Sequence, residues 1–245
     1  MNIITILLVT VLVATIGCNA DYLEYRKVHL VDQTPPFESS GNVNLLFRGN
    51  EPKISVNGTD QFAYEELINC MVNNSLSLGV KFPPQFYLFD IKLIYNHTSE
   101  LPDIDLEKTY FEANPSIGQF NTNITMGDLS DPHFIPSFER LKWAINLTEW
   151  QKDDLPARME LYRNILYTEM DLPVVLYIHC ECGCDRTGEV FASYVMKYLG
   201  WSFKKAIEWD YQIAGRIILP QHQFAANWYC YWLEFVEKMD IDCSS

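Results

Sequence analysis

The stretch VVLYI at residues 174–178 constrains the fold more than any other part of the sequence. It is a continuous run of β-branched and aromatic residues, which is typical of a strand covered on both faces within a parallel sheet. The loop HCECGCDRTG follows at 179–188, and apolar residues then recur at helical spacing from Val190 to Leu199, ending at Gly200. We therefore predict an α/β fold with a central, largely parallel sheet flanked by helices.

The sequence patterns around this unit predict further helices and strands, some more strongly than others. KWAINL at 142–147 alternates apolar and polar residues, which predicts a half-buried strand, and the loop TEWQKDDLP follows it. Helices are predicted from Pro156 until DLP at 171–173 ends the first one, after Ser202, and after the LPQHQF segment at 219–224. In residues 21–137, FAYEELINCMV at 62–72 looks helical and FYLFDIKLIYN at 86–96 looks like a strand, but prolines interrupt the pattern and no chemistry is predicted there.

The amino-terminal segment predicts the compartment. Residues 3–16 are almost wholly apolar, too few to span a membrane, and small residues stand at Cys18 and Ala20. This pattern indicates a secretory signal at 1–20, cleaved before Asp21, and a single domain over 21–245 that is secreted or held in the secretory-pathway lumen. The alternative is an uncleaved anchor, because no Lys or Arg precedes the apolar run. The later sequence has no other stretch of membrane length, so we expect no stable membrane insertion.

Charge and glycosylation signals restrict the partners. The net charge of −14 argues against nucleic acid as a partner, because nucleic acid favours clusters of Lys and Arg. In a secreted chain, Asn-x-Ser/Thr sequons are glycan acceptors; they occur at Asn57, Asn73, Asn96, Asn123 and Asn146. Without Cys18, six cysteines remain, an even number that suggests disulfides with a pairing that cannot be read from sequence; Cys70, Cys230 and Cys243 are plausible partners.

The loop after the predicted strand has the composition of an anion site that carries a nucleophile. A loop between a parallel strand and a helix presents backbone N–H groups and the positive end of the helix dipole. These dipoles favour a thiolate on Cys180. Gly183 permits a tight turn, and the planar fork of Arg186 can bind two phosphate oxygens at once. Thr187 can donate a hydrogen bond to the sulfur, and His179 can brace the loop through backbone groups.

His-Cys, five residues, Arg and Thr together resemble the catalytic signature of the cysteine-dependent protein tyrosine and dual-specificity phosphatase superfamily. The resemblance covers residues 143–238, including GWSFKKAI and RIILPQHQF, and is faint in the first half, at FRGNEP. It implies that the phosphate is bound by the loop residues Glu181, Cys182, Gly183, Cys184, Asp185 and Arg186. It also implies a phosphocysteine intermediate on Cys180, an aspartic acid that protonates the leaving oxygen, and no metal or other cofactor.

The family places the acid on a loop after a strand. Asp153 and Asp154, in WQKDDLP, follow the predicted strand KWAINL and are favoured for this role. Asp185 is the competitor, because lipid-directed members use an aspartate of the phosphate loop. Acidic residues just before a helix are also usual N-caps, so that one of the pair at 153–154 can cap while the other works.

The loop cysteines and the loop sequence also allow other interpretations. Zinc ligation by Cys180, Cys182 and Cys184 is disfavoured, because ligands at alternate positions of a tight loop do not close a tetrahedron. A disulfide within the loop would close a small, strained ring. The leading substrates are phosphotyrosine or phosphoserine/threonine in proteins. The alternatives are an inositol phosphate or phosphoinositide, since DRTG also resembles the loops of myotubularins, and a silent phosphate-binding pseudophosphatase.

Overall fold

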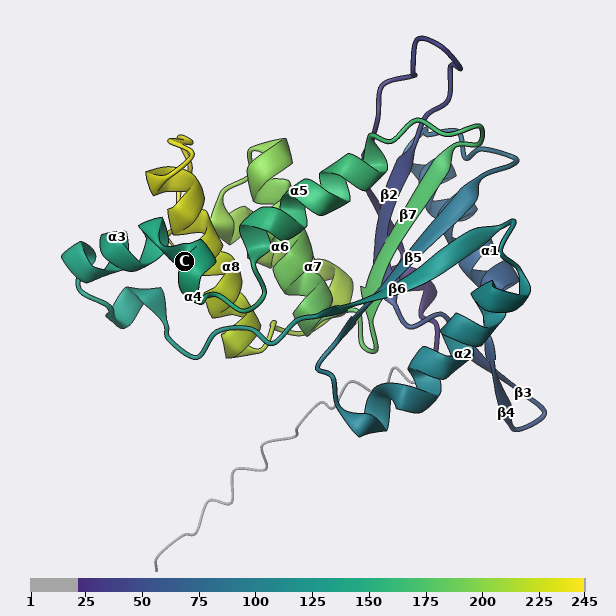
Figure 1. The fold of residues 1–245 in the computed structure, drawn as a ribbon, viewed down its shortest axis with the longest axis horizontal. Coiled ribbons are helices and arrows are strands. Elements are labelled where there is room, and N and C mark those ends of the chain that lie inside the picture. The colour runs from purple at the N-terminus through teal and green to yellow at the C-terminus, as the bar shows by residue number, and fades with distance from the viewer. Residues whose placement is uncertain (1–21, 245) are drawn as a thin grey trace, which may run out of the picture.

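The protein is described here over residues 22–244 by a computed structural model (Figure 1). Its strands are β1 His29–Gln33, β2 Leu45–Asn50, β3 Lys53–Val56, β4 Thr59–Phe62, β5 Tyr87–Ile94, β6 Gly118–Ile124 and β7 Val174–Cys180. Its α-helices are α1 Tyr64–Ser77, α2 Leu101–Ala113, α3 Ser137–Ile145, α4 Leu147–Trp150, α5 Leu155–Leu166, α6 Asp185–Leu199, α7 Phe203–Ala214 and α8 Pro220–Phe235. Short 3₁₀ turns are η1 Tyr25–Lys27, η2 Thr98–Glu100 and η3 Pro132–Phe134.

Five strands form the central sheet, in the order β1-β2-β7-β5-β6. Only β1 runs antiparallel to its neighbour; β7 pairs in parallel with β2 on one side and with β5 on the other. The predicted α/β class with a largely parallel sheet is therefore confirmed. Because β2, β7, β5 and β6 all point the same way, the segments that follow them meet at one edge of the sheet, where open α/β sheets bind ligands.

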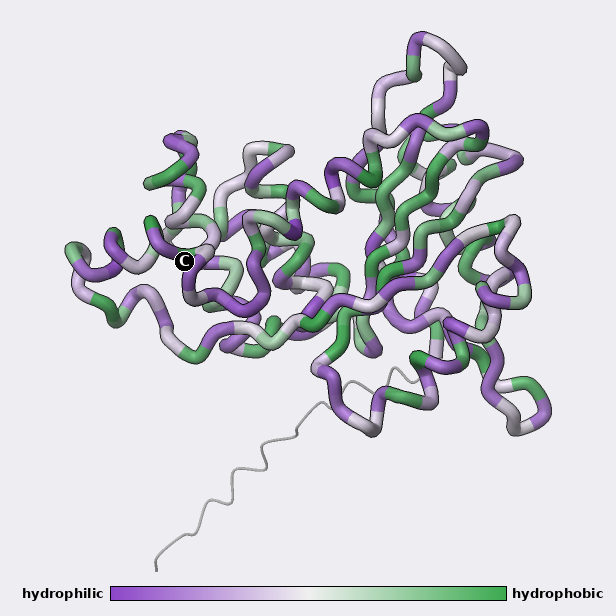
Figure 2. Tube along the Cα trace, viewed as in Figure 1, coloured by the Kyte–Doolittle hydropathy of each residue, from purple (hydrophilic) through white to green (hydrophobic). Residues whose placement is uncertain are grey.

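Helices cover both faces of the sheet (Figure 1). One core cluster joins the sheet to α5, α6, α7 and α8, and contains Leu176, Ile178, Phe191 and Trp228. The second lies on the face covered by α1 and α2, and contains Phe47 and Tyr177. The strands in the middle of the sheet are coloured as strongly hydrophobic in Figure 2, and all seven residues of β7 are buried, as expected for a strand with helices on both sides.

Most of the predicted elements occur, but the strand predicted at 142–147 is wrong. This segment belongs to α3 and α4. Ala144 and Leu147, three positions apart, are fully buried, while Trp143 and Ile145 are 38% and 48% exposed. The Trp143 ring stacks on Trp228 with the centroids 5.7 Å apart, so the aromatic residue is used between helices and not on a sheet. The short alternating pattern at 142–147 therefore belongs to helices that bury only a narrow stripe of side chains, which includes Ala144 and Leu147.

The C-terminal segment is tied back to the last helix. Cys230 of α8 and Cys243 form a disulfide with a Cα–Cα separation of 5.6 Å. Cys70, the third candidate for a bridge, keeps its thiol within the core, and burial raises its pKa to about 12. Across residues 22–244, no helix has the length and apolar character needed to cross a bilayer. The predicted signal at 1–20 lies outside the described residues.

Candidate functional site

The loop after β7 curls around the sulfur of Cys180 at the carboxyl edge of the sheet. The Gly183 amide donates a hydrogen bond to Cys180 Sγ at 3.2 Å. Gly183 has φ +68°, and a Cβ at this position would lie 2.6 Å from the carbonyl oxygen of Gly49. A side chain is therefore excluded twice, by backbone conformation and by lack of space. The predicted need for glycine at this turn agrees with the geometry.

The electrostatics of the loop favour a thiolate. Burial acts to raise the pKa of Cys180, but the charge of Arg186 and hydrogen bonds from the side chain and backbone of Thr187 outweigh it, so the pKa lies below its ordinary value. Thr187 is buried, and its hydroxyl also lies 3.5 Å from the carbonyl oxygen of Gly49. By contrast, burial raises the pKa of the neighbouring Cys184 to about 11. Two cysteines four residues apart thus have opposite tendencies to ionise, and only Cys180 has those of a nucleophile.

The end of β5 and the residues that follow it, 95–100, hold Arg186. Its Nη1 donates to the carbonyl oxygen of Leu93 at 2.8 Å and to a carboxylate oxygen of Glu100. Its Cζ lies 4.1 Å from the centre of the Tyr95 ring, a cation–π contact. Its Nη2 lies 3.9 Å from Glu181 Oε2, a rim carboxylate that is about half exposed. Nη1 is thus occupied by the protein, and Nη2 remains directed to the rim of the loop.

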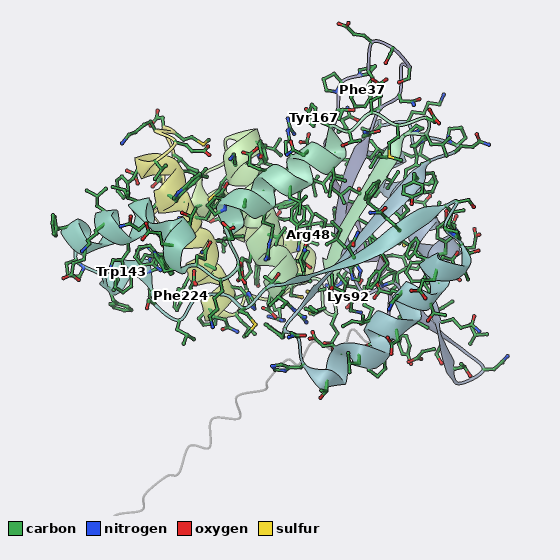
Figure 3. The ribbon with its side chains drawn as sticks, viewed as in Figure 1. Phe37, Arg48, Lys92, Trp143, Tyr167 and Phe224 are labelled. Carbon is green, nitrogen blue, oxygen red and sulfur yellow. A yellow bond between two sulfur atoms is a disulfide. The ribbon has the colours of Figure 1, made fainter. Side chains whose placement is uncertain are left out.

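The end of β2 supports the loop from behind. The Nη2 of Arg48 donates to the carbonyl oxygen of Gly183 at 2.9 Å and to Asp210 Oδ1 at 2.5 Å. The Glu51 amide donates to the carbonyl oxygen of Glu181 at 3.2 Å. Arg48 is fully buried and lies well inside the molecule (Figure 3). These bonds hold the carbonyl groups of Gly183 and Glu181, and so fix the backbone of the loop. The segment is FRGNEP, where the sequence resemblance was faint.

His179 lies in a buried ionic cluster beneath the loop. Its Nε2 is 3.1 Å from Asp90 Oδ1 and 3.0 Å from Glu107 Oε2. Burial lowers its pKa, but the two carboxylates outweigh this effect and raise it to about 10. The ammonium of Lys92 (Figure 3) bridges Glu107 and Glu51 at 2.6 and 2.7 Å. The predicted bracing role of His179 therefore works through side chains of β5 and α2.

The same cluster is the place where a metal ion could be held among the described residues. Asp90, Glu107 and His179 each offer a ligand atom within 4.8 Å of the others. The proton on His179 Nε2 and the ammonium of Lys92 already face these carboxylates, so a divalent ion would have to displace the proton and approach a fixed cation. We assign the cluster to support of the loop.

Asp185 is engaged by the segment before α8. Its carboxylate forms a two-pronged ion pair with Arg216, with one contact at 2.8 Å, and accepts a hydrogen bond from the Leu219 amide at 2.8 Å. It is 8% exposed. These contacts clamp the first turn of α6 to the 216–219 segment, so Asp185 has a ready structural role.

The two aspartates favoured as the acid, Asp153 and Asp154, differ in burial and in hydrogen bonding. Asp153 is 1% exposed, and its carboxylate accepts hydrogen bonds from the amides of Met126 and Gly127 at 2.7–3.0 Å. A buried carboxylate that accepts several amide hydrogen bonds is an anchor for those amides. Asp154 is exposed at the start of α5 with φ +43° and makes no side-chain cap there. Asp153, in the loop WQKDDLP, thus supports the turn that contains Met126 and Gly127, and the acid role of the pair stays a prediction.

That turn carries Asp128, which the sequence analysis missed. Asp128 comes four residues after β6, and its amide donates to the carbonyl oxygen of Gln221 at 2.9 Å. Its carboxylate accepts a hydrogen bond from Gln151 at 2.8 Å. Burial, followed by the charge of Asp153, raises the pKa of Asp128 to about 6 against the effect of Gln151. It is a partly buried carboxyl group that follows a strand and holds its proton unusually well.

The first half of the chain therefore contributes to the site, contrary to the prediction that it has no chemistry. Leu93 lies near the end of β5, Tyr95 and Glu100 follow that strand, and Asp128 follows β6. The signal was available in part: FYLFDIKLIYN was recognised as a strand, and residues after a strand parallel to β7 must reach the same edge. GQFNTNI at 118–124 gave no strand signal, because β6 is an edge strand with few buried residues.

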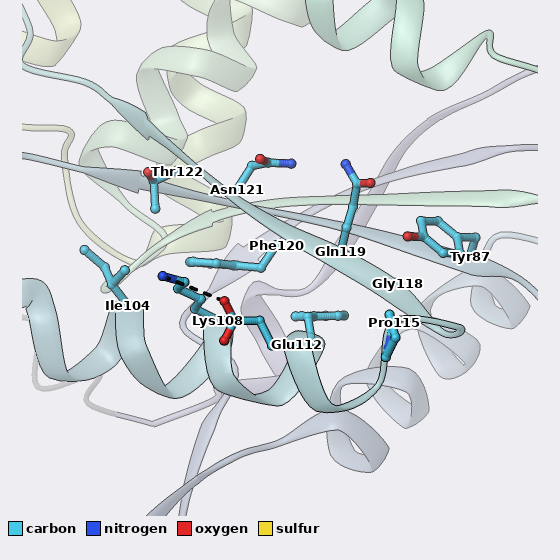
Figure 4. A pocket seen from close by; sticks show the side chains of 11 residues that line it. Tyr87, Ile104, Lys108, Glu112, Pro115, Gly118, Gln119, Phe120, Asn121 and Thr122 are labelled. Carbon is cyan, nitrogen blue, oxygen red and sulfur yellow. Dashed lines mark ion pairs between the residues drawn. The ribbon is translucent and has the colours of Figure 1, made fainter.

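A separate groove of about 530 Å³ lies between α2 and β6 (Figure 4). It is lined by residues of α2, by Tyr87 at the start of β5 and by the 118–122 segment of β6, and no residue of the 179–188 loop lines it. It carries one exposed ion pair, Lys108–Glu112, at 3.8 Å. We do not assign the phosphate chemistry to this groove.

Comparisons with known proteins give structural similarity only. A scan against protein-family models finds no match, and neither does a search of the curated proteins. Among solved structures, PTPMT1 in complex with PI(5)P is 15% identical, with 79% of this chain and 93% of that chain covered and a TM-score of 0.36. Tk-PTP in the active form is 15% identical, with 82% and 92% covered and a TM-score of 0.33. The human tyrosine phosphatase-like serine/threonine/tyrosine-interacting protein is 13% identical, with 74% and 85% covered and a TM-score of 0.32.

Proposed function

We propose that the protein is a phosphomonoesterase that uses Cys180 as its nucleophile and passes through a phosphocysteine. The observation that carries the proposal is the geometry at Cys180, where the Gly183 amide donates to the sulfur at 3.2 Å. Arg186 and Thr187 lower the pKa of the same thiol. A thiolate at the centre of an anion-binding loop is suited to attack a phosphorus atom that the same loop holds.

The two steps balance without a cofactor. In the first, the S–P bond forms and the bond from phosphorus to the leaving oxygen breaks, while an acid gives that oxygen a proton. In the second, water attacks the phosphocysteine and the S–P bond breaks, with the acid residue now accepting a proton from the water. Arg186 binds the equatorial oxygens in both steps. Thr187, which hydrogen-bonds to the sulfur, stabilises the departing thiolate.

We assign the acid role to Asp128. Its pKa of about 6 leaves it partly protonated in mildly acidic to neutral solution, as a general acid requires. It is half-buried, whereas Asp153 is enclosed and Asp185 is held by Arg216. Its turn is anchored from below by Asp153 and from the side by Gln221. The loop that was expected to deliver the proton thus supports the turn that does so.

The rim of the site supports a phosphorylated protein as the substrate. Met126 and Leu129 adjoin Asp128 along the chain, and Ile217 and Leu219 belong to the segment that binds Asp185. These four apolar side chains are 38–94% exposed. An apolar rim suits an aromatic ring or neighbouring apolar side chains. Arg186 and Arg216 each already face a carboxylate. Lys27 and Arg48, which bind carbonyls of the loop, are also paired with carboxylates. An inositol ring with several phosphates would need additional cations.

A substrate panel tests the proposal. Purified residues 21–245, assayed in reductant, should hydrolyse aryl phosphates and phosphotyrosine peptides, and should act on inositol phosphates at least about 10-fold less well, because of the missing cations. Hydrolysis of inositol phosphates or phosphoinositide vesicles in preference to peptides would support the alternative substrate class. Binding of phosphopeptides with no turnover of any substrate would support a pseudophosphatase.

We also propose that the chain is secreted or lumenal. The apolar leader and the sequons support this, and the sequons differ in their surroundings. Asn57 and Asn96 are exposed and have φ +53° and +65°, and Asn57 lies in the turn between β3 and β4. Asn123 is half-buried, and its side-chain oxygen accepts a hydrogen bond from Tyr162 at 2.8 Å. Asn73 is exposed within α1, and Asn146 is half-buried and donates to the Lys142 carbonyl oxygen. Asn57 and Asn96 are therefore the acceptors that we favour.

A further inference from the structure

A buried chain of polar side chains begins at Tyr95, the residue that stacks on Arg186. Tyr95 Oη lies 2.7 Å from His222 Nε2, and His222 Nδ1 lies 2.6 Å from Glu189 Oε2. His222, at the start of α8, and Glu189, one turn after Arg186 in α6, are both fully buried. Polar groups at this depth carry a large cost unless each is paired, so the chain is a fixed arrangement.

The chain continues from Glu189 to the turn that bears Asp128. Burial, then the charge of Asp153 and a hydrogen bond between the two carboxyl groups, raise the pKa of Glu189 well above its ordinary value. Glu189 Oε1 is buried, and within residues 22–244 no N–H or hydroxyl group donates to it. We therefore place on this oxygen the proton that is shared with Asp153. Asp153 in turn accepts the amide hydrogens of Met126 and Gly127. One end of the chain thus touches Arg186, and the other holds the two residues before Asp128.

The protonation states determine which group donates and which accepts in each hydrogen bond from Tyr95 to Asp153. Burial lowers the pKa of His222 to about 4, so at neutral pH the ring carries a single proton. Tyr95 then donates to His222 Nε2, and His222 Nδ1 donates to Glu189. Glu189 donates to the Asp153 carboxylate. Removal of the Tyr95 hydroxyl would leave a buried imidazole nitrogen without its donor and weaken the bonds that follow.

Tyr95 is also connected to Arg186 by a second route. Its backbone amide donates to Glu100 Oε2 at 2.9 Å, and the other oxygen of Glu100 binds Arg186. The Tyr95 ring lies over the guanidinium at 4.1 Å. The ring and the backbone of Tyr95 therefore set the position of Arg186, while its hydroxyl faces the buried chain.

We propose that Tyr95 is a positioning residue which couples the phosphate-binding Arg186 to the turn that bears Asp128. The coupling runs through a relay of three buried side chains, His222, Glu189 and Asp153. This inference rests on the proposed function, because it assigns Arg186 to phosphate and Asp128 to the leaving oxygen. With the relay formed, the proton donor is held in register with the bound phosphoryl group.

The kinetic test compares Tyr95→Phe with wild-type protein on p-nitrophenyl phosphate, a good leaving group, and phenyl phosphate, a poor one. Tyr95→Phe keeps the ring over Arg186 and removes only the hydroxyl, so we expect kcat for phenyl phosphate to fall about 5- to 50-fold, as for a typical coupling between sites, with KM nearly unchanged. The kcat for p-nitrophenyl phosphate should stay within about twofold, because this substrate does not need the acid. In the Asp128→Asn background, Tyr95→Phe should cost nothing further. Equal losses on both substrates would show a merely structural role and overturn the proposal.

A second measurement does not depend on turnover. Amide hydrogen exchange at Met126 and Gly127, followed by NMR, should be several-fold faster in Tyr95→Phe than in wild type, because their acceptor Asp153 is less firmly held. Tyr211→Phe is the matched control: Tyr211 is 51% exposed on α7, outside the relay, and should change neither exchange nor kinetics. Unchanged exchange at both amides would overturn the relay even in an active enzyme. Faster exchange in a protein that hydrolyses no phosphate would support the relay and reject the proposed function.

Discussion

Replacement of Cys180 by serine should abolish turnover of every phosphomonoester, on the order of 10⁴-fold or more, while substrate binding persists. A serine hydroxyl is not ionised by the Arg186 charge and the Thr187 hydrogen bonds that favour the thiolate. The amides of the loop and the guanidinium remain, so phosphate is still bound. Isothermal titration of the serine variant with a phosphotyrosine peptide, beside its kinetics, checks both parts.

Arg186→Ala provides the contrasting variant. It should lower kcat/KM by about 10³- to 10⁵-fold and should also remove binding, because the bidentate partner of two phosphate oxygens is gone. Cys70→Ala is the matched cysteine control, since Cys70 is buried in α1 within the other core cluster and should leave turnover unchanged. If Cys180→Ser and Arg186→Ala lose binding equally, the division of roles is wrong. Residual turnover by Cys180→Ser near the wild-type rate would reject the nucleophile.

Asp128→Asn should slow the hydrolysis of phenyl phosphate by about 10²- to 10⁴-fold and largely spare p-nitrophenyl phosphate. A poor leaving oxygen needs the proton, and asparagine cannot supply it. In the wild type, the pKa of Asp128 is raised to about 6 by burial and by Asp153. The acid works only when protonated, so activity on phenyl phosphate should fall as the pH rises through about 6. This alkaline limb should be absent from the pH profile of the variant.

Three further substitutions make this experiment decisive. Asp131→Asn is the matched control, because Asp131 caps η3 three residues later and should leave the dependence on the leaving group unchanged. Asp154→Asn and Asp185→Asn test the residues that the sequence favoured. If either one, and not Asp128→Asn, removes the alkaline limb and slows only the poor leaving group, the assignment fails. An effect confined to Asp185 would favour the lipid-directed class of enzyme.

The part of the site that could be predicted from sequence is the part that is local. Cys180, Gly183, Arg186 and Thr187 lie within eight residues, and the strand before them and the helix after them have unambiguous apolar patterns. Backbone geometry then fixes how such neighbours face one another. The α/β class followed from the same unit.

The part that could not be predicted depends on pairings between distant strands. Asp128 follows β6, whose sequence GQFNTNI is half polar because the strand lies at the edge of the sheet. Because the sequence of β6 does not predict a strand, KWAINL was predicted to be the strand before the acid. Its alternating pattern belongs instead to helices, and its Trp143 packs on Trp228. The relay from Tyr95 to Asp153 joins four separate segments, and no local pattern marks such residues as neighbours.

The support of the loop by β2 has a consequence for the order in which the protein folds. Arg48 reaches Gly183 across 135 residues of chain, and Gly49 meets Thr187 across 138. Contacts at such sequence separation carry a large loop-closure entropy and form late relative to local ones. A chain that has formed β7 and α6 but has not yet docked β2 contains all residues of the phosphate-binding loop. It lacks the contacts from Arg48 and Glu51 that fix the backbone of that loop. The nucleophile therefore acquires its full reactivity only once β2 has docked against β7.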